Sequence, residues 1–206
     1  MLYFTADKKD ANQLLNLGAV WDNELCRWRV ESFSDYKKFA KWINGKIITD
    51  ELYILEAEDI CPFCNSPVKL AAIACGEYSE DFLPVKFGTD CVNFLYGFEN
   101  VSSPLAKILR ERFSIKERYV PSYGYKYLVN GCNCCGKAFP DEYLFADVSS
   151  PFYINEEKCA QKLKVYSIPL GFDVALEGKI AFSFEKSLFS GCKKEVLKDI
   201  NFFASK

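Results

Sequence analysis

Two cysteine pairs of identical spacing stand out in the chain, Cys61-Pro-Phe-Cys64 and Cys132-Asn-Cys-Cys135. A Cys-x-x-Cys turn brings two sulfurs near one point, and two facing turns complete a tetrahedral shell of four thiolates around Zn²⁺, with Zn–S distances of about 2.3 Å. Pro62 stiffens the first turn, while Asn65 and Gly136 follow each pair and tolerate a positive φ. The spacing therefore predicts one zinc site with four ligands: Cys61, Cys64, Cys132 and Cys135.

The separation of the two pairs is unusual, because 67 residues lie between them where a simple zinc ribbon has about 15 to 20. We therefore expect the intervening segment to form an insertion or a subdomain. Redox-active or merely buried cysteines are the alternative interpretation, although no thioredoxin-like βαβ pattern surrounds either pair. Within the metal interpretation, Cys75, Cys91 or Cys134 can replace a proposed ligand. Four thiolates leave no open coordination position, which favours a structural ion.

Composition and charge exclude several classes of protein. Half of the 206 residues are apolar and 16% are aromatic, which excludes a disordered or low-complexity chain. The chain has 26 basic and 28 acidic residues, so the strong excess of positive charge that is typical of duplex-binding proteins is missing. No apolar run approaches the roughly 18 residues that span a bilayer, and the N-terminus lacks the pattern of a signal peptide. We expect a cytoplasmic protein without a membrane partner.

Histidine is absent from the chain. Its absence excludes histidine-activated nucleophiles, histidine general acids or bases and histidine metal ligands. No Gly-rich phosphate-binding motif is present either. We therefore predict that the protein is not an enzyme. Catalysis by carboxylates stays open as an alternative, with candidates that no motif orients: Glu77, Glu80, Asp81 and Asp90.

Residues 51–100 form an acidic segment, with nine acidic residues against two lysines. The simplest interpretation is a solvated face that keeps the protein soluble. The alternative is an acidic surface that docks on a basic partner, such as a nucleic-acid-binding protein.

Residues 1–50 are expected to form a small unit with a βαββα order of elements. The expected elements are a strand over 3–5, a helix between Asp7 and Gly18, a hairpin over 21–30 and a second helix between Ser34 and Gly45. Trp21 and Trp28 lie on the two arms of the hairpin. We expect both to form the core of this unit, and a ligand-stacking platform is the alternative.

Residues 51–206 are expected to form a zinc-stabilised, sheet-rich domain that is like a zinc ribbon, which makes the whole chain α+β. A proline at the first helical position predicts a helix that begins at Ser103-Pro104. A second helix is expected over 193–203. The expected strands cover 47–55, 68–74, 125–129, 143–148, 165–168, 172–176 and 180–184.

The run from Leu17 to Trp28 is similar to the LGAxWDxxxxxW signature of a small domain of unknown function. That domain occurs in bacterial and phage proteins, including conjugative-plasmid primases. The matching positions are Leu17, Gly18, Ala19, Trp21, Asp22 and Trp28. The resemblance implies a shared architecture and an origin in a mobile element, while the function of the family is itself unknown.

Residues 125–152 resemble the knuckle N-x-CphCgaxqgdxyL…GPF, which follows this domain in stand-alone members of the family. Pro140 departs from the expected glycine, and so does Ser150. The matching positions are Asn130, Cys132, Cys135, Gly136, Leu144, Pro151 and Phe152.

Together these observations predict a non-enzymatic zinc-binding protein of a phage or plasmid. We expect it to bind a protein partner and to inhibit a nucleic-acid-handling or defence complex. The alternative is an accessory protein that binds DNA or RNA directly. The candidate contacts for either partner are six basic residues: Arg27, Arg29, Lys37, Lys41, Arg110 and Arg112.

Overall fold

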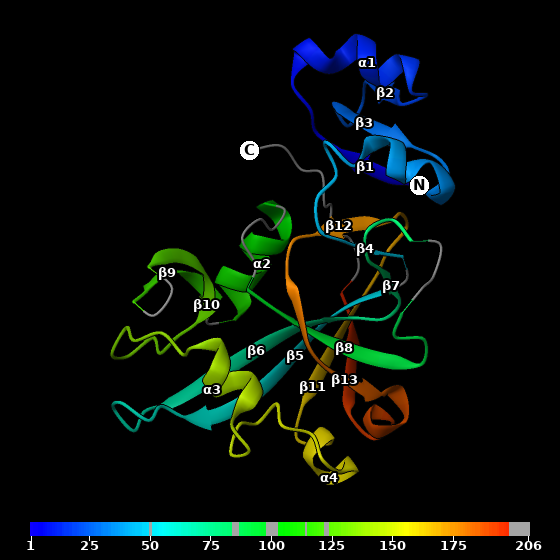
Figure 1. Ribbon diagram of the computed structural model, residues 1–206. Helices are drawn as coiled ribbons and strands as arrows, with labels where there is room; N and C mark the ends of the chain where they lie inside the picture. Colours follow the sequence, from blue (N-terminus) through cyan, green and yellow to red (C-terminus); the bar gives the residue numbers. More distant parts are fainter. Residues whose placement is uncertain (50, 84–86, 98–102, 114, 122–123, 198–206) are drawn as a thin grey trace.

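The structure is a computed structural model, which describes residues 1–49, 51–83, 87–97, 103–113, 115–121 and 124–197. A small three-stranded sheet built from the N-terminal residues lies at one end of the molecule, and a larger sheet fills the other end (Figure 1). The predicted mixed α+β class with a high strand content is confirmed. Asp50, where the predicted boundary between the two units falls, lies outside the described residues.

The larger sheet has six strands in the order β13-β8-β6-β5-β11-β14. Neighbouring strands are antiparallel except β11 and β14, which are parallel. The strands are β5 (Glu51–Ile60), β6 (Pro67–Cys75), β8 (Cys91–Tyr96), β11 (Lys164–Pro169), β13 (Lys179–Glu185) and β14 (Lys193–Val196).

Both faces of this sheet are buried, which explains the apolar run Leu70–Cys75 in β6. Successive side chains of a strand point to opposite faces. The side chains of one face belong to a hydrophobic cluster that also contains Cys61 and Cys132. We call this cluster the knuckle core. The side chains of the other face belong to a second cluster, which includes residues of helix α2 (Ser103–Arg112). We call this second cluster the α2 core. The predicted helix start at Ser103-Pro104 is confirmed.

The knuckle core is covered by two short helices, α3 (Asp141–Ala146) and α4 (Glu157–Ala160), and by the 3-10 helix η3 (Lys186–Phe189). A two-stranded ribbon of β9 (Ile115–Val120) and β10 (Tyr125–Asn130) leads into the second cysteine pair. β8 and β9 were not predicted from the sequence.

The N-terminal sheet has the order β1-β3-β2 and its own core, in which Leu14, Tyr36 and Phe39 are fully buried. The turn after α1 ends at Gly18, whose φ of +95° is the positive value that the glycine was expected to supply. The elements are β1 (Leu2–Phe4), η1 (Lys8–Asp10), α1 (Ala11–Asn16), β2 (Val20–Asp22), β3 (Arg27–Val30) and η2 (Phe33–Phe39).

A third sheet lies between these two, with β4 (Lys46–Ile48) paired to β12 (Val174–Leu176) and to β7 (Tyr78–Ser79). The Tyr36 hydroxyl donates to the Asp173 carboxylate at 2.5 Å, so the N-terminal core is tied directly to the segment before β12. The predicted strand over 47–55 is therefore two strands, β4 and β5, which belong to different sheets.

The second helix predicted between Ser34 and Gly45 is a 3-10 helix over Phe33–Phe39. A 3-10 helix has three residues per turn, so side chains three apart share one face. Phe33, Tyr36 and Phe39 follow this spacing, and all three pack in the N-terminal core. The three-residue spacing of these aromatic side chains therefore fits a 3-10 helix.

Two further sequence predictions were wrong. The strand expected over 143–148 is helix α3, in which Asp141, Leu144 and Phe145 are buried with the i, i+3, i+4 spacing of a helix. The helix expected over 193–203 begins instead as strand β14, because Lys193–Val196 pairs with the edge of β11. Residues 198–203 lie outside the described residues.

Candidate metal centre

The first cysteine pair forms the turn at the end of the β5–β6 hairpin. The Cys61 amide donates to the carbonyl of Ser66 at 2.9 Å, and the Asn65 amide donates to the carbonyl of Cys61 at 2.9 Å. Asn65 has a φ of +57°, in the left-handed region that asparagine tolerates. This turn is the first knuckle, residues 61–66.

The second cysteine pair repeats that geometry directly after β10. The Cys132 amide donates to the carbonyl of Lys137 at 2.9 Å, and the Gly136 amide donates to the carbonyl of Cys132 at 3.0 Å. Gly136 has a φ of +75°, while a Cβ added there would contact nothing within 4 Å. Backbone conformation rather than crowding therefore favours glycine at this position. This turn is the second knuckle, residues 132–137.

The structure brings the four predicted ligands together, with all four sulfurs within 4.8 Å of one another. The sulfurs of Cys61 and Cys135 are 3.8 Å apart, and those of Cys64 and Cys132 are 3.6 Å apart. In a regular tetrahedron with Zn–S bonds of 2.3 Å, sulfurs are separated by about 3.8 Å. The cluster can thus hold one metal ion that both knuckles share.

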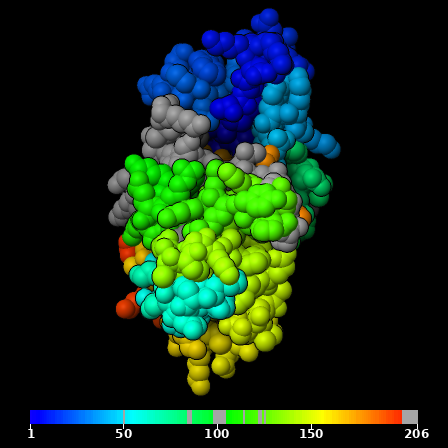
Figure 2. Space-filling view, turned by 90° about the vertical axis from the view of Figure 1, so that its left-hand side faces the viewer, coloured from blue at the N-terminus to red at the C-terminus, as the bar shows by residue number. Residues whose placement is uncertain are grey.

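The chain positions that meet here are far apart in sequence. The space-filling view shows the end of the β5–β6 hairpin, in cyan, lying against the yellow-green segment that follows β10 (Figure 2). Cys61 and Cys132 are buried in the knuckle core, whereas Cys135 is exposed. An ion at this point would therefore join two segments at the edge of a core.

Hydrogen-bond donors lie close to the sulfurs of Cys132 and Cys64. The amides of Cys134 and Cys135 point to the Cys132 sulfur, at 3.3 and 3.5 Å. The Ser66 hydroxyl and amide donate to Cys64 and lower the pKa of that thiol to about 6. For Cys135 the Lys137 amide lowers the pKa, but burial and the neighbouring sulfurs raise it more, to about 11. These are the contacts expected around a ligated sulfur.

The three cysteines considered as alternative ligands, Cys75, Cys91 and Cys134, lie outside this cluster of four. Cys75 is buried at the end of β6, where burial raises the pKa of its thiol to about 12. Cys91 is on β8, and Cys134 is exposed within the second knuckle. All ten cysteines are free thiols, so no disulfide competes for the four ligands.

Asn130 anchors the second knuckle, and sequence reasoning did not single it out as a site residue. Its side-chain oxygen accepts from the Ala71 amide, and its side-chain nitrogen donates to the Ala71 carbonyl, both at 2.8 Å. The β6–β8 ladder covers only Ile73–Cys75, so Asn130 pairs the backbone of β6 where β8 has ended. The signal in the sequence was its match to the first position of the knuckle motif, two residues before Cys132.

Basic residues surround the knuckles as well. Arg118 donates to the carbonyl of Gly136 at 2.7 Å, and its guanidinium lies against Gly131, where a Cβ would come within 2.3 Å of it. The Lys137 ammonium lies 4.6 Å from the centre of the Phe63 ring. Four thiolates around a divalent ion would carry a net charge of about −2, which nearby cations would partly offset.

The six candidate partner-contact residues lie on three separate elements. Two of them, Arg27 and Arg29, are on β3. Lys37 is in η2 and Lys41 lies just after it, while Arg110 and Arg112 are on α2. At least four of the six contact carboxylates of described residues: Arg29 with Asp22 and Glu31, Lys41 with Asp10, Arg110 with Glu117, and Arg112 with Glu195. These contacts neutralise much of the charge on which binding to a nucleic-acid backbone depends.

The two tryptophans of the predicted hairpin differ in burial. Trp28 is 6% exposed and packs in the N-terminal core, as expected, whereas Trp21 is 42% exposed. Their rings meet edge to face at 5.3 Å. Trp21 is accessible because β2 lies at an edge of its sheet.

Comparisons with protein-family models, with curated proteins and with solved structures found no match to this chain. The resemblance to the small phage and plasmid domain stays a prediction. No helix among the described residues has the length and apolarity needed to cross a membrane.

Proposed function

We propose that this chain is a non-enzymatic binding protein whose fold is held by one structural zinc ion. The observation that carries the proposal is the set of four sulfurs within 4.8 Å, contributed in pairs by two knuckles of the same geometry. Soft thiolates in a tetrahedral arrangement are the ligands that Zn²⁺ takes in structural sites. Four protein ligands fill the coordination shell, so the ion would have no position left for a substrate.

The ion would fasten the second half of the chain to the central sheet. Cys61 and Cys64 end the β5–β6 hairpin, while Cys132 and Cys135 lead into α3, which covers the knuckle core. Without the ion, four thiols would crowd one point and the two knuckles would lose the link between their sulfurs, while the hydrogen bonds of Asn130 and Arg118 would remain. Metal binding would therefore contribute directly to folding.

We further propose that the protein acts by occupying a protein partner, in keeping with an origin in a phage or plasmid. Exposed apolar side chains of the N-terminal unit support this, with Leu15 at 56%, Val20 at 43% and Trp21 at 42% exposure. Tryptophan at an exposed strand edge is typical of binding surfaces. A partner from a nucleic-acid-handling or defence complex would fit the acidic residues 51–100, because such proteins carry basic surfaces.

Affinity purification from a bacterial lysate, with and without nuclease, tests the partner. We expect a host protein that stays bound after nuclease treatment, that is lost with Trp21→Ala and that is retained with Tyr153→Ala. Tyr153 is a matched control because it is also an exposed aromatic residue, at 38%. If no protein is enriched at low or high salt, the partner proposal is wrong. Capture that nuclease abolishes would instead favour the DNA- or RNA-binding alternative.

A further inference from the structure

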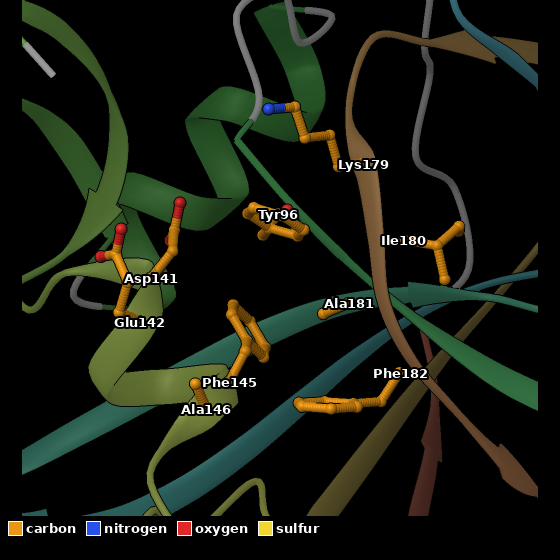
Figure 3. A pocket seen from close by; sticks show the side chains of 9 residues that line it. All are labelled: Tyr96, Asp141, Glu142, Phe145, Ala146, Lys179, Ile180, Ala181 and Phe182. Carbon is orange, nitrogen blue, oxygen red and sulfur yellow. The ribbon is translucent and has the colours of Figure 1, made fainter.

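A cavity of about 300 Å³ lies between helix α3 and strand β13, away from the cysteine cluster. Figure 3 shows Asp141 and Glu142 on the α3 side, Lys179 and Phe182 on the β13 side, and the rings of Tyr96 and Phe145 between them. The cavity thus combines aromatic walls with charged groups of opposite sign. It does not involve the metal ligands.

A β-bulge shapes one wall of this cavity. Ile180 pairs with Leu95 and Ser183 pairs with Asn93, so two residues of β13 stand opposite Phe94 of β8. Regular alternation would turn Ala181 and Phe182 to opposite faces, yet both pack toward the knuckle core and line the cavity, while Ile180 packs in the α2 core on the other face. Bulges re-aim side chains in this way and are enriched beside binding sites.

The charged groups lie on opposite walls. Asp141 is only 8% exposed, and burial raises the pKa of its carboxyl to about 6, although the Tyr127 hydroxyl and the Gly97 amide oppose that shift. Lys179 is exposed, and within the part of the chain that the structure describes no carboxylate pairs with its ammonium. A ligand that bridges the two walls would pair with the Lys179 ammonium and offer the Asp141 carboxyl a further hydrogen-bond donor.

We propose that this cavity binds a nucleoside monophosphate, with an amino-bearing base at Asp141 and the phosphate at Lys179. The rings of Tyr96, Phe145 and Phe182 offer surfaces on which a base can stack, and such stacking contributes about 1–3 kcal/mol per base. A carboxyl oxygen accepts from the exocyclic amine of a base, and a lysine ammonium attracts a phosphate as a point charge. The volume lies at the small end of ligand pockets, about 300–1,000 Å³, which suits one nucleotide rather than two.

Calorimetric titration of the full chain in its metal-loaded form tests this inference. Two matched pairs of probes isolate the base amine: cytidine against uridine monophosphate, and guanosine against inosine monophosphate. We expect the amino-bearing member of each pair to bind about tenfold more tightly, since one hydrogen bond to a charged group is lost in the other. Asp141→Asn is expected to reduce that preference, because the amide oxygen that replaces the carboxylate is a neutral and weaker acceptor.

Lys179→Gln is expected to weaken all four nucleotides about tenfold and to leave the corresponding nucleosides unaffected. Lys162→Gln is the control, because Lys162 is an exposed lysine that lines a different cavity. Lys179 is exposed, so its substitution keeps the test valid even if Asp141→Asn fails to fold. The inference is wrong if none of the four nucleotides binds at about 1 mM, or if both lysine variants weaken binding equally.

Discussion

Cys61→Ser is expected to yield a chain that no longer binds zinc and that is insoluble or rapidly cleaved by proteases. Cys61 is fully buried, and its sulfur lies 3.8 Å from that of Cys135 on the other knuckle. Structural zinc contributes about 10–16 kcal/mol in small zinc domains, which is comparable to the entire stability of a typical domain, about 5–15 kcal/mol. Thermal unfolding, limited proteolysis and zinc content would be measured together.

Cys134→Ser is the matched control for that variant. Cys134 is in the second knuckle, but it is exposed and its sulfur is not one of the four that cluster. We expect its zinc content and unfolding temperature to equal those of the unaltered chain. A Cys61→Ser chain that unfolded at the same temperature as Cys134→Ser would rule out a structural role for the centre.

Asn130→Ala is expected to lower the free energy of unfolding by about 2–4 kcal/mol, because two buried backbone groups of Ala71 lose their partners. For a chain of this size, the unfolding temperature would fall by roughly 4–16 °C. The variant should still bind zinc, since its ligands are intact. Thermal unfolding monitored by circular dichroism checks the first expectation and elemental analysis the second.

Asn133→Ala provides the comparison for Asn130→Ala. Asn133 is at the exposed tip of the same knuckle, and its side-chain oxygen accepts a long hydrogen bond, 3.4 Å, from the Lys116 ammonium. Its removal should change the unfolding free energy by no more than about 0.5 kcal/mol. Equal destabilisation by both variants would show that Asn130 does not anchor the knuckle to β6.

The cluster of four cysteines was predictable because the information for each knuckle is local. Each knuckle is a turn of six residues, and the residue types at Asn65 and Gly136 match the positive φ that the turn requires. The pairing of two knuckles 67 residues apart followed from chemistry, since two thiolates alone do not complete a tetrahedral shell. Local conformation and ligand number were therefore enough to predict the set of four.

The elements that prediction missed depend on distant partners. Residues Lys193–Val196 alternate too little to indicate a strand, and they become β14 because an edge of β11 is available. The Asn130 side chain forms hydrogen bonds with the backbone of Ala71, 59 residues earlier in the chain, and no local sequence pattern predicts such a contact. The cavity beside α3 likewise depends on a bulge that arises only when β13 pairs with β8.

A single ion shared by the two knuckles is the central proposal for this protein. The most direct measurement is elemental analysis of the full chain, freshly purified without added metal and without chelator, together with its unfolding temperature before and after chelation. We predict one zinc per chain, and a fold that is lost when a strong chelator removes it. A folded chain that contains no transition metal, and whose unfolding temperature a chelator leaves unchanged, would contradict it.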